Sequence, residues 1–230
     1  MNQPVVDSRV AVTLVAGGPC GARDLAMARK RAPCVVAADG GADRALALGV
    51  MPQAVIGDLD SLSQAGRARL GPDRVFRIDE QETTDFDKAL RLIAAPFVLA
   101  VGVAGRRIDH ELAVLSGLFR HQALAGGRMP CLLLGRQDVI LAAPPRLSLR
   151  LRAGDRLSLF PLAPVTGRSR GLVWPIDGLR LAPDGRIGTS NRVDSGPVDL
   201  EFDAPGMLVI LPRARLDAAI AGVMAAQNSG

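Results

Sequence analysis

The segment V-I-G-D-L-D-S-L at residues 55–62 places two carboxylates, Asp58 and Asp60, two residues apart where a hydrophobic run ends. In an extended chain, such side chains point to the same face and lie roughly 6.5–7 Å apart along the strand. Two anions held this close repel each other unless a cation lies between them or one of them keeps its proton. The pair therefore predicts either a bound cation or a shared proton.

Further acidic residues follow other short hydrophobic runs. They are Asp39 in A-A-D-G-G-A-D, Asp85 in E-T-T-D-F-D and Asp109 in G-R-R-I-D-H. Helix N-capping explains a single Asp at such a position, and Asp109, just ahead of a long helical pattern, fits a cap as well as it fits a functional role. Because one helix start needs one cap, capping does not explain Asp58 and Asp60 as a pair.

Magnesium explains the pair, since it takes oxygen ligands from one or two carboxylates together with phosphate oxygens. The neighbouring glycines, Gly57 and Gly40–Gly41, suit a nucleotide whose phosphates approach the backbone. Sugar hydrolysis is the competing use of two carboxylates. It calls for an aromatic cleft, and one Trp, six Phe and no Tyr argue against one. The A-G-G-P-C-G loop at 16–21 is a weak phosphate-binding signal, and no G-x-x-x-x-G-K-[ST] loop is present.

Short apolar runs alternate with helical patterns over roughly the first 135 residues, which is typical of a parallel α/β sheet. In such sheets, ligands bind beyond the carboxyl ends of the strands, where these acidic residues fall. The predicted strands are Val10–Val15, Cys34–Ala38, Ala54–Ile56, Val75–Ile78, Phe97–Val103 and Cys131–Leu134. The predicted helices are Arg23–Arg31, Ala42–Leu48, Ser63–Leu70, Asp85–Ala94 and Asp109–Ala123.

The pattern changes after about residue 137. Segments Arg146–Arg152 and Arg156–Phe160 alternate with period two, and Val198–Phe202 and Met207–Leu211 are short strand-like runs between Pro and Gly. This predicts antiparallel β structure, a sandwich or open barrel, closed by a helix at Leu216–Met224. We therefore expect two domains, residues 1–136 and 140–230.

Composition limits the class of protein. The net charge is +5, but the arginines are scattered without interleaved aromatic residues, so we expect no nucleic-acid partner. No apolar run reaches the ~20 residues of a membrane span, and we expect no membrane partner. The three cysteines, Cys20, Cys34 and Cys131, fit neither a disulfide framework nor a zinc site. Reduced thiols and no visible signal peptide predict a cytoplasmic location.

Taken in order, several motifs resemble those of the thiamine pyrophosphokinase (thiamine diphosphokinase) family, and the similarity spans residues from about 10 to 211. The motifs are D-G-G-A-D (39–43), G-D-L-D-S (57–61), T-D-F-D-K-A-L (84–90), G-R-R-I-D-H (105–110), G-L-V-W (171–174) and T-S-N (189–191). Single motifs such as D-G-G-A are weak, whereas the ordered set is specific.

The resemblance implies transfer of the diphosphoryl group of ATP to the hydroxyethyl oxygen of thiamine, with release of AMP and with Mg²⁺. It also implies a homodimer with thiamine at the subunit interface, and a Rossmann-like nucleotide domain followed by a β-sandwich that binds thiamine. Asp58, Asp60 and Asp85 would surround the metal and the reacting phosphates as catalytic and metal-binding residues. Asp109 would be catalytic on the substrate side.

ATP-binding residues implied by the resemblance are Asp39, Gly40, Gly41, Arg106 and Arg107. Whether Asp85 is a base or a metal ligand stays open.

Thiamine recognition is implied for Trp174, by stacking on the pyrimidine, and for Ser190 and Asn191, by hydrogen bonds to its edge. A lone Trp in a β domain is more often part of the core, and the motif context favours the ligand role. Pro175 directly follows and disfavours a helix there.

Two positions depart from the family pattern. Thr83 stands where the family often has a basic residue, and Arg106 replaces a glycine of a G-G-R motif. Two alternative functions also remain. One is diphosphoryl transfer to a different alcohol such as a pterin, and the other is a non-catalytic nucleotide or thiamine sensor.

Overall fold

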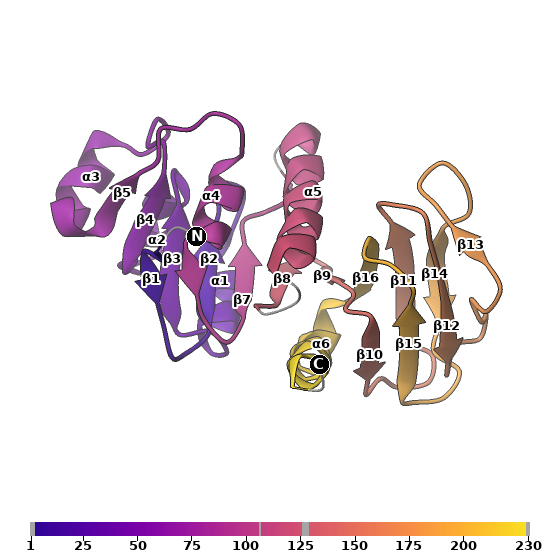
Figure 1. Ribbon diagram of the computed structural model, residues 1–230. Coiled ribbons are helices and arrows are strands. Elements are labelled where there is room, and N and C mark those ends of the chain that lie inside the picture. Colours follow the sequence, from indigo (N-terminus) through magenta and orange to yellow (C-terminus); the bar gives the residue numbers. More distant parts are fainter. Residues whose placement is uncertain (1–2, 106, 126–128, 229–230) are drawn as a thin grey trace. The chain divides into compact units, whose positions relative to one another are not determined.

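The computed structural model describes residues 3–105, 107–125 and 129–228, and the chain divides into two compact units between His121 and Gln122 (Figure 1). The first unit is built on parallel strands and the second on antiparallel strands. No helix in these residues is long and apolar enough to cross a membrane.

Five parallel strands form the sheet of the first unit, in the order β7-β2-β3-β4-β5. These strands are β2 (Val12–Val15), β3 (Cys34–Ala38), β4 (Ala54–Gly57), β5 (Val75–Arg77) and β7 (Val98–Val101). The helices of this unit are α1 (Ala22–Arg29), α2 (Gly41–Ala47), α3 (Gln64–Leu70), α4 (Asp85–Arg91) and α5 (Ile108–Ala125), with a 3₁₀ turn at Pro72–Arg74. The prediction of a parallel α/β sheet is confirmed.

Continuous burial accounts for the composition of these strands. Every residue of β2, β4 and β7 is buried, because helices cover the sheet. Helix α1 packs on β2 and β7, and α4 packs on β3 and β4.

The structure differs from the prediction at the helix expected for Asp85–Ala94. Helix α4 ends at Arg91, and β6 (Ile93–Ala94) pairs in parallel with β1 (Val6–Asp7).

Two antiparallel sheets form the second unit. One has the order β10-β15-β12-β13, and the other contains the run β14-β11-β16-β9-β8. The strands of the first are β10 (Arg146–Leu149), β12 (Val165–Arg170), β13 (Arg180–Leu181) and β15 (Val198–Phe202). The strands of the second are β8 (Cys131–Leu134), β9 (Asp138–Ala142), β11 (Arg156–Pro161), β14 (Gly188–Arg192) and β16 (Met207–Pro212). A 3₁₀ turn at Arg213–Arg215 leads into α6 (Leu216–Gln227).

Alternation with period two in the sequence corresponds to alternating burial in this unit. In β10, Leu147 and Leu149 are buried and the intervening Ser148 is exposed, so one face of the strand covers a core. The prediction of antiparallel β structure and of a closing helix is therefore confirmed.

Strand β8 (Cys131–Leu134), predicted from its apolar run, falls in the second unit. It pairs antiparallel with β9, with Leu132 opposite Leu141, and it belongs to the second unit. The physical reason for the antiparallel pairing is the short connection between β8 and β9, where the Gly135 N–H donates to the Asp138 carbonyl at 2.8 Å. Three residues suffice for a hairpin, whereas a parallel crossover needs a dozen or more. The two compact units divide between His121 and Gln122, and the predicted domains 1–136 and 140–230 stay a prediction.

Candidate active site

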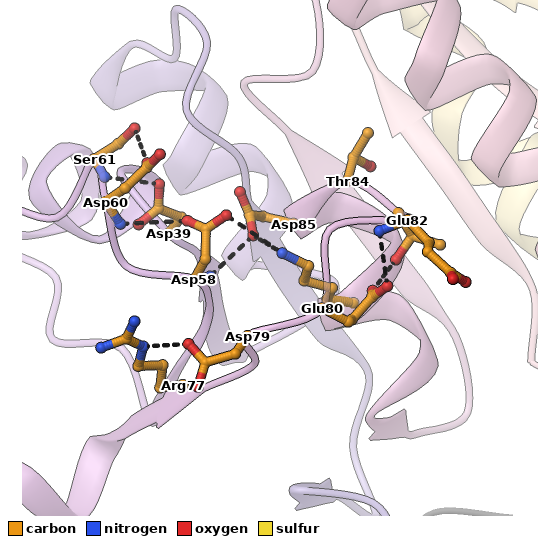
Figure 2. Close-up of polar contacts among 12 residues, drawn as sticks. Asp39, Asp58, Asp60, Ser61, Arg77, Asp79, Glu80, Glu82, Thr84 and Asp85 are labelled. Carbon is orange, nitrogen blue, oxygen red and sulfur yellow. Dashed lines mark hydrogen bonds and ion pairs between the residues drawn. The ribbon is translucent and has the colours of Figure 1, made fainter.

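Four carboxylates converge at one edge of the parallel sheet, and we call Asp39, Asp58, Asp60 and Asp85 the acidic cluster (Figure 2). Asp39 follows β3, Asp58 and Asp60 follow the neighbouring strand β4, and Asp85 opens α4. Adjacent parallel strands end at the same edge, which is why residues far apart in the sequence meet there. The cluster therefore lies where an open α/β sheet binds its ligands.

The chain between Asp58 and Asp60 is not extended, contrary to the simple strand picture. Leu59 adopts a φ of +68° and its side chain is buried, so the backbone turns over an apolar anchor. The Asp60 N–H donates to Asp58 Oδ1 at 3.3 Å, as in a turn closed by an Asp side chain. One oxygen each of Asp39, Asp58 and Asp60 lies within 4.8 Å of the other two, which is closer than an extended chain would bring the pair.

Gly57 makes room for this convergence. A Cβ atom at this position would lie 2.9 Å from Asp85 Oδ1 and 3.0 Å from Asp39 Cβ, closer than real Cβ contacts. Any side chain here would push the two aspartates apart. Gly41 has a different role, because its Cβ would lie 2.1 Å from the Val15 carbonyl oxygen, so this glycine lets α2 pack against β2.

Lys88 is a site residue that the sequence analysis missed. Its side chain is 1% exposed, and its ammonium lies 3.4 Å from Asp58 Oδ2 and 3.2 Å from Asp85 Oδ1. Asp85 and Lys88 are three residues apart on α4, a spacing at which helical side chains meet. That spacing, in a chain where the other basic residues but Lys30 are arginines, is the signal that could have found it.

The pKa values of Asp39 and Asp58 are shifted in opposite directions. Burial raises the pKa of the Asp39 carboxyl, and the charge of Asp85 raises it further, although hydrogen bonds from Ser61 oppose the shift. Partial burial also acts to raise the pKa of Asp58, but the Asp60 amide and the Lys88 ammonium outweigh it and leave the pKa below its ordinary value. Asp58 is thus held as an anion before any ligand binds.

A divalent cation fits the donors present. Asp39 is 5% exposed, its Oδ2 accepts the Ser61 N–H at 3.2 Å, and its buried Oδ1 finds no hydrogen-bond donor in the described part of the chain. A buried carboxylate oxygen without a partner is costly. An all-carboxylate set suits a hard cation such as Mg²⁺. The set grouped by geometry is Asp39, Asp58 and Asp60, whereas the predicted metal set held Asp85 in place of Asp39.

A cavity of about 780 Å³ opens beside the acidic cluster. Its walls include Gly17 and Gly18 of the loop after β2, Gly40, Thr83 and Arg107. The 16–21 loop thus contributes to the cavity, and a Cβ at Gly18 would lie 2.4 Å from the Gly102 carbonyl oxygen. The Thr83 hydroxyl donates to Glu80, so this departure from the family pattern supplies no cation.

Asp109 is not brought into the acidic cluster. It lies in the first turn of α5, its side chain is 59% exposed, and it pairs with Arg107 at 2.5 Å. The hydrogen bond from Arg107 is the main cause that holds the pKa of Asp109 below its ordinary value. Arg107 itself reaches the cavity wall. Arg106 lies outside the described residues.

Trp174 lies in the second unit and its ring is exposed rather than part of a core. The residue is 55% exposed, and the Arg192 guanidinium carbon lies 5.7 Å from the ring centroid. This observation favours the ligand role over the core role.

Asn191 holds the backbone of Trp174. Its Nδ2 donates to the Trp174 carbonyl at 2.7 Å, and its Oδ1 accepts the Trp174 N–H at 3.3 Å and the Arg192 N–H at 2.8 Å. Asn191 is 6% exposed, and its side-chain amide makes three hydrogen bonds to backbone groups, which gives it a positioning role. Ser190 beside it is exposed, with a φ of +62°, and its N–H donates to Ser158 Oγ at 3.0 Å.

Comparison with known proteins assigns both units. Residues 25–125 match the family model described as the thiamin pyrophosphokinase catalytic domain. Residues 146–207 match the model described as the thiamin pyrophosphokinase vitamin B1 binding domain. The chain belongs to the thiamine pyrophosphokinase family.

Relatives of this family resemble the chain over most of its length. Thiamine pyrophosphokinase 1 of Oryza sativa is 25% identical over 208 residues, 76% of this chain and 77% of the relative. Thiamine pyrophosphokinase 1 of Arabidopsis thaliana is 26% identical over 66% of this chain and 62% of the relative. The thiamin pyrophosphokinase structure from Candida albicans has a TM-score of 0.76 at 15% identity, covering 91% of this chain and 93% of that one, which shows a shared fold.

Proposed function

We propose that this protein is a thiamine diphosphokinase that transfers the diphosphoryl group of ATP to the hydroxyethyl oxygen of thiamine and releases AMP. The observation that carries the proposal is the acidic cluster beside a 780 Å³ cavity, in a unit that matches the family's catalytic domain. The match of residues 146–207 to the vitamin B1 binding domain supports thiamine as the acceptor.

Mg²⁺ is the proposed metal, with Asp39, Asp58 and Asp60 as the residues that would hold it. When bound, such an ion neutralises charge on the phosphates of ATP. The first unit is then the nucleotide-binding, Rossmann-like half of the enzyme. Gly40 and Arg107 line the cavity and are proposed to face the nucleotide.

Asp85 is the proposed acceptor of the alcohol proton, and we propose this role for it in preference to that of a metal ligand. Its Oδ1 accepts the Asp58 N–H at 3.1 Å and the Lys88 ammonium, so the carboxylate is held at the cavity wall and outside the group of three. In the proposed step, the hydroxyethyl oxygen of thiamine forms a bond to the β-phosphorus. The bridging oxygen between the α- and β-phosphorus leaves with AMP, and the alcohol proton passes to Asp85.

Thiamine is proposed to stack on the exposed Trp174 ring, because a cationic, π-deficient ring favours Trp as its platform. We call residues 171–179, between β12 and β13, the Trp174 loop. We further propose a homodimer in which the Trp174 loop of one subunit contributes to the active site at the acidic cluster of its partner. Exposed apolar side chains in both units support an interface between copies: Ile108 and Leu112 are 70% and 59% exposed, and Ile187 is 43% exposed.

A cytoplasmic location is part of the proposal. Cys34 and Cys131 are free thiols, as expected of a protein kept in a reducing compartment. Burial raises the pKa of the Cys131 thiol well above its ordinary value, which keeps it inert.

One assay separates the proposed function from its rivals. AMP release from Mg-ATP is measured with thiamine, with a hydroxymethylpterin, and with no acceptor. We expect AMP to form only with thiamine. Release with the pterin alone would assign a different acceptor, and binding of both ligands without AMP would indicate a sensor.

A further inference from the structure

Lys88 has a feature that the proposed reaction does not use, namely an ammonium group buried among the reacting carboxylates. Taking a lysine charge out of water costs several kcal/mol unless anions compensate it. Here the side chain is 1% exposed, and two carboxylates provide the compensation. The pKa of Lys88 reflects the same balance. Burial lowers this pKa, but the hydrogen bond to Asp85 and the charges of Asp85 and Asp58 raise it above its ordinary value.

The contacts around Lys88 form a closed ring. Its Nζ donates to Asp85 Oδ1 and to Asp58 Oδ2, and the Asp58 N–H donates to the same Asp85 Oδ1 at 3.1 Å. Asp58 is also oriented from its other oxygen, which accepts the Asp60 N–H. The Lys88 ammonium thus connects Asp58, in the turn after β4, to Asp85, in the first turn of α4.

The charge count makes this contact necessary. The acidic cluster holds four carboxylates, and among the ion pairs of residues 3–105, 107–125 and 129–228, Lys88 is the only cation joined to any of them. Arg107, the other basic residue considered above, pairs with Asp109 instead. Without Lys88, the facing Asp58 and Asp85 carboxylates would lie close together without a counter-charge.

We propose that Lys88 is a positioning residue that holds Asp58 and Asp85 in place in the free enzyme and shares the task of neutralising them with the metal. The inference rests on the proposed function, because it takes the acidic cluster as a metal site. It predicts that a divalent cation partly substitutes for the missing ammonium.

Thermal unfolding of the Lys88→Met protein, with EDTA and then with saturating Mn²⁺, tests this directly. Breaking a buried ion pair should lower the Tm by about 10 °C in EDTA. With Mn²⁺, the gap between wild type and variant should shrink by at least half. Lys30→Met is the matched control, because Lys30 is exposed at the end of α1, and it should change neither value.

A second variant separates charge from packing. In an Asp85→Asn background, Lys88→Met should cost less than half of the Tm loss that it causes in the wild type, because its main partner is already neutral. If Lys88→Met does not fold while Lys88→Met/Asp85→Asn does, the proposal is supported. If both fail to fold, the lysine is needed for packing and the proposal is overturned.

Steady-state kinetics of Lys88→Met test whether Lys88 positions the reacting groups. We expect Lys88→Met to lower kcat by about tenfold or more while the KM for thiamine stays the same, because misplaced reacting groups slow the step without weakening thiamine binding. A Tm gap that Mn²⁺ leaves unchanged, in a protein whose wild type Mn²⁺ stabilises, overturns the inference alone. A wild type that Mn²⁺ does not stabilise overturns the metal site as well.

Discussion

The acidic cluster and the Trp174 loop, which are the two proposed binding sites, are organised in opposite ways. In the cluster, Asp39, Asp58 and Asp85 are already bonded to backbone amides and, for the latter two, to a buried lysine. In the loop, Asn191 binds the backbone of Trp174, a residue that is 55% exposed. One site presents fixed charge, and the other presents an uncovered aromatic face.

This difference follows from the cost of burial. Charged groups that leave water must be compensated before the ligand arrives, so the polar site is organised by hydrogen bonds. Leaving an aromatic ring exposed to water costs little free energy, so the ring needs no covering group in the free protein. We therefore expect changes in the cluster to act on turnover and changes in the loop to act on thiamine affinity.

The largest effect on turnover is expected for Asp58→Asn and Asp60→Asn. Each removes one charge from the proposed metal set, and we expect turnover to fall by about 10²-fold or more with an intact fold. The measurement is AMP release across a Mg²⁺ titration, with circular dichroism for the fold. Asp73→Asn, an exposed aspartate beyond α3, is the control and should have wild-type activity. Near-normal turnover of both variants at low Mg²⁺ would rule out the metal role.

Mixing two impaired variants tests whether each active site draws on both subunits. Asp58→Asn and Trp174→Ala chains are combined under conditions of subunit exchange. Half of the dimers should be mixed, with one intact site of two, which gives about a quarter of wild-type activity at low thiamine. No rescue despite demonstrated exchange, or a fully active monomer in sedimentation, would contradict the shared site.

Trp174→Ala should raise the KM for thiamine by about tenfold and leave the KM for ATP almost unchanged, because only the stacking surface is lost. Trp174→Phe keeps an aromatic face and should have a smaller effect. Since the ring is half exposed, the Tm should change little. An unchanged thiamine KM together with a clearly lower Tm would return the ring to a structural role.

Asn191→Ala should show a mixed phenotype. The Trp174 and Arg192 amides lose a buried acceptor, so we expect a loss of about 1–3 kcal/mol in the free energy of unfolding. Thiamine KM should rise only a few-fold, as the ring remains present but less fixed. Urea unfolding and steady-state kinetics measure the two effects. A large KM change with full stability would indicate direct contact with thiamine instead.

The smallest effect on activity is expected at Asp155, in the second unit, which pairs with Arg215 at 2.6 and 2.8 Å. The Arg215 hydrogen bonds lower the pKa of Asp155, although partial burial opposes them. The pair therefore stabilises the protein above the ordinary Asp pKa of about 3.9, and this contribution is lost as the pH falls through the lower folded pKa. Asp155→Asn should cost about 1–3 kcal/mol at pH 7 and little near pH 2. An equal cost at both pH values would show that the pair's charge is unimportant.

The local elements were largely predictable from the sequence, because buried parallel strands leave continuous apolar runs. Cys34–Ala38 and Val198–Phe202 have the bounds that their patterns predict. The antiparallel partner of β8 was not predicted, since an apolar run does not reveal which strand pairs with it, and only the three-residue connection to β9 indicates that pair.

The sequence predicted that these acidic residues gather at one edge of the sheet, but it did not predict their contacts. Asp39, Asp58 and Asp85 were found because acidic residues after strands mark the edge of the sheet. The turn at Leu59 and the role of Lys88 depend on backbone conformation and burial, which a pattern of residue types does not encode. Asp109 was placed with the site by motif alone, and its pairing with Arg107 in the first turn of α5 lies apart from the cluster.

The transfer of an intact diphosphoryl group is the central claim, and ATP labelled with ³²P at the β-phosphorus tests it most directly. After incubation with thiamine and Mg²⁺, the products are separated and counted. The account predicts that the label appears in thiamine diphosphate and that the AMP released in equal amount is unlabelled. Label in ADP together with thiamine monophosphate would show transfer of a single phosphoryl group and contradict the account.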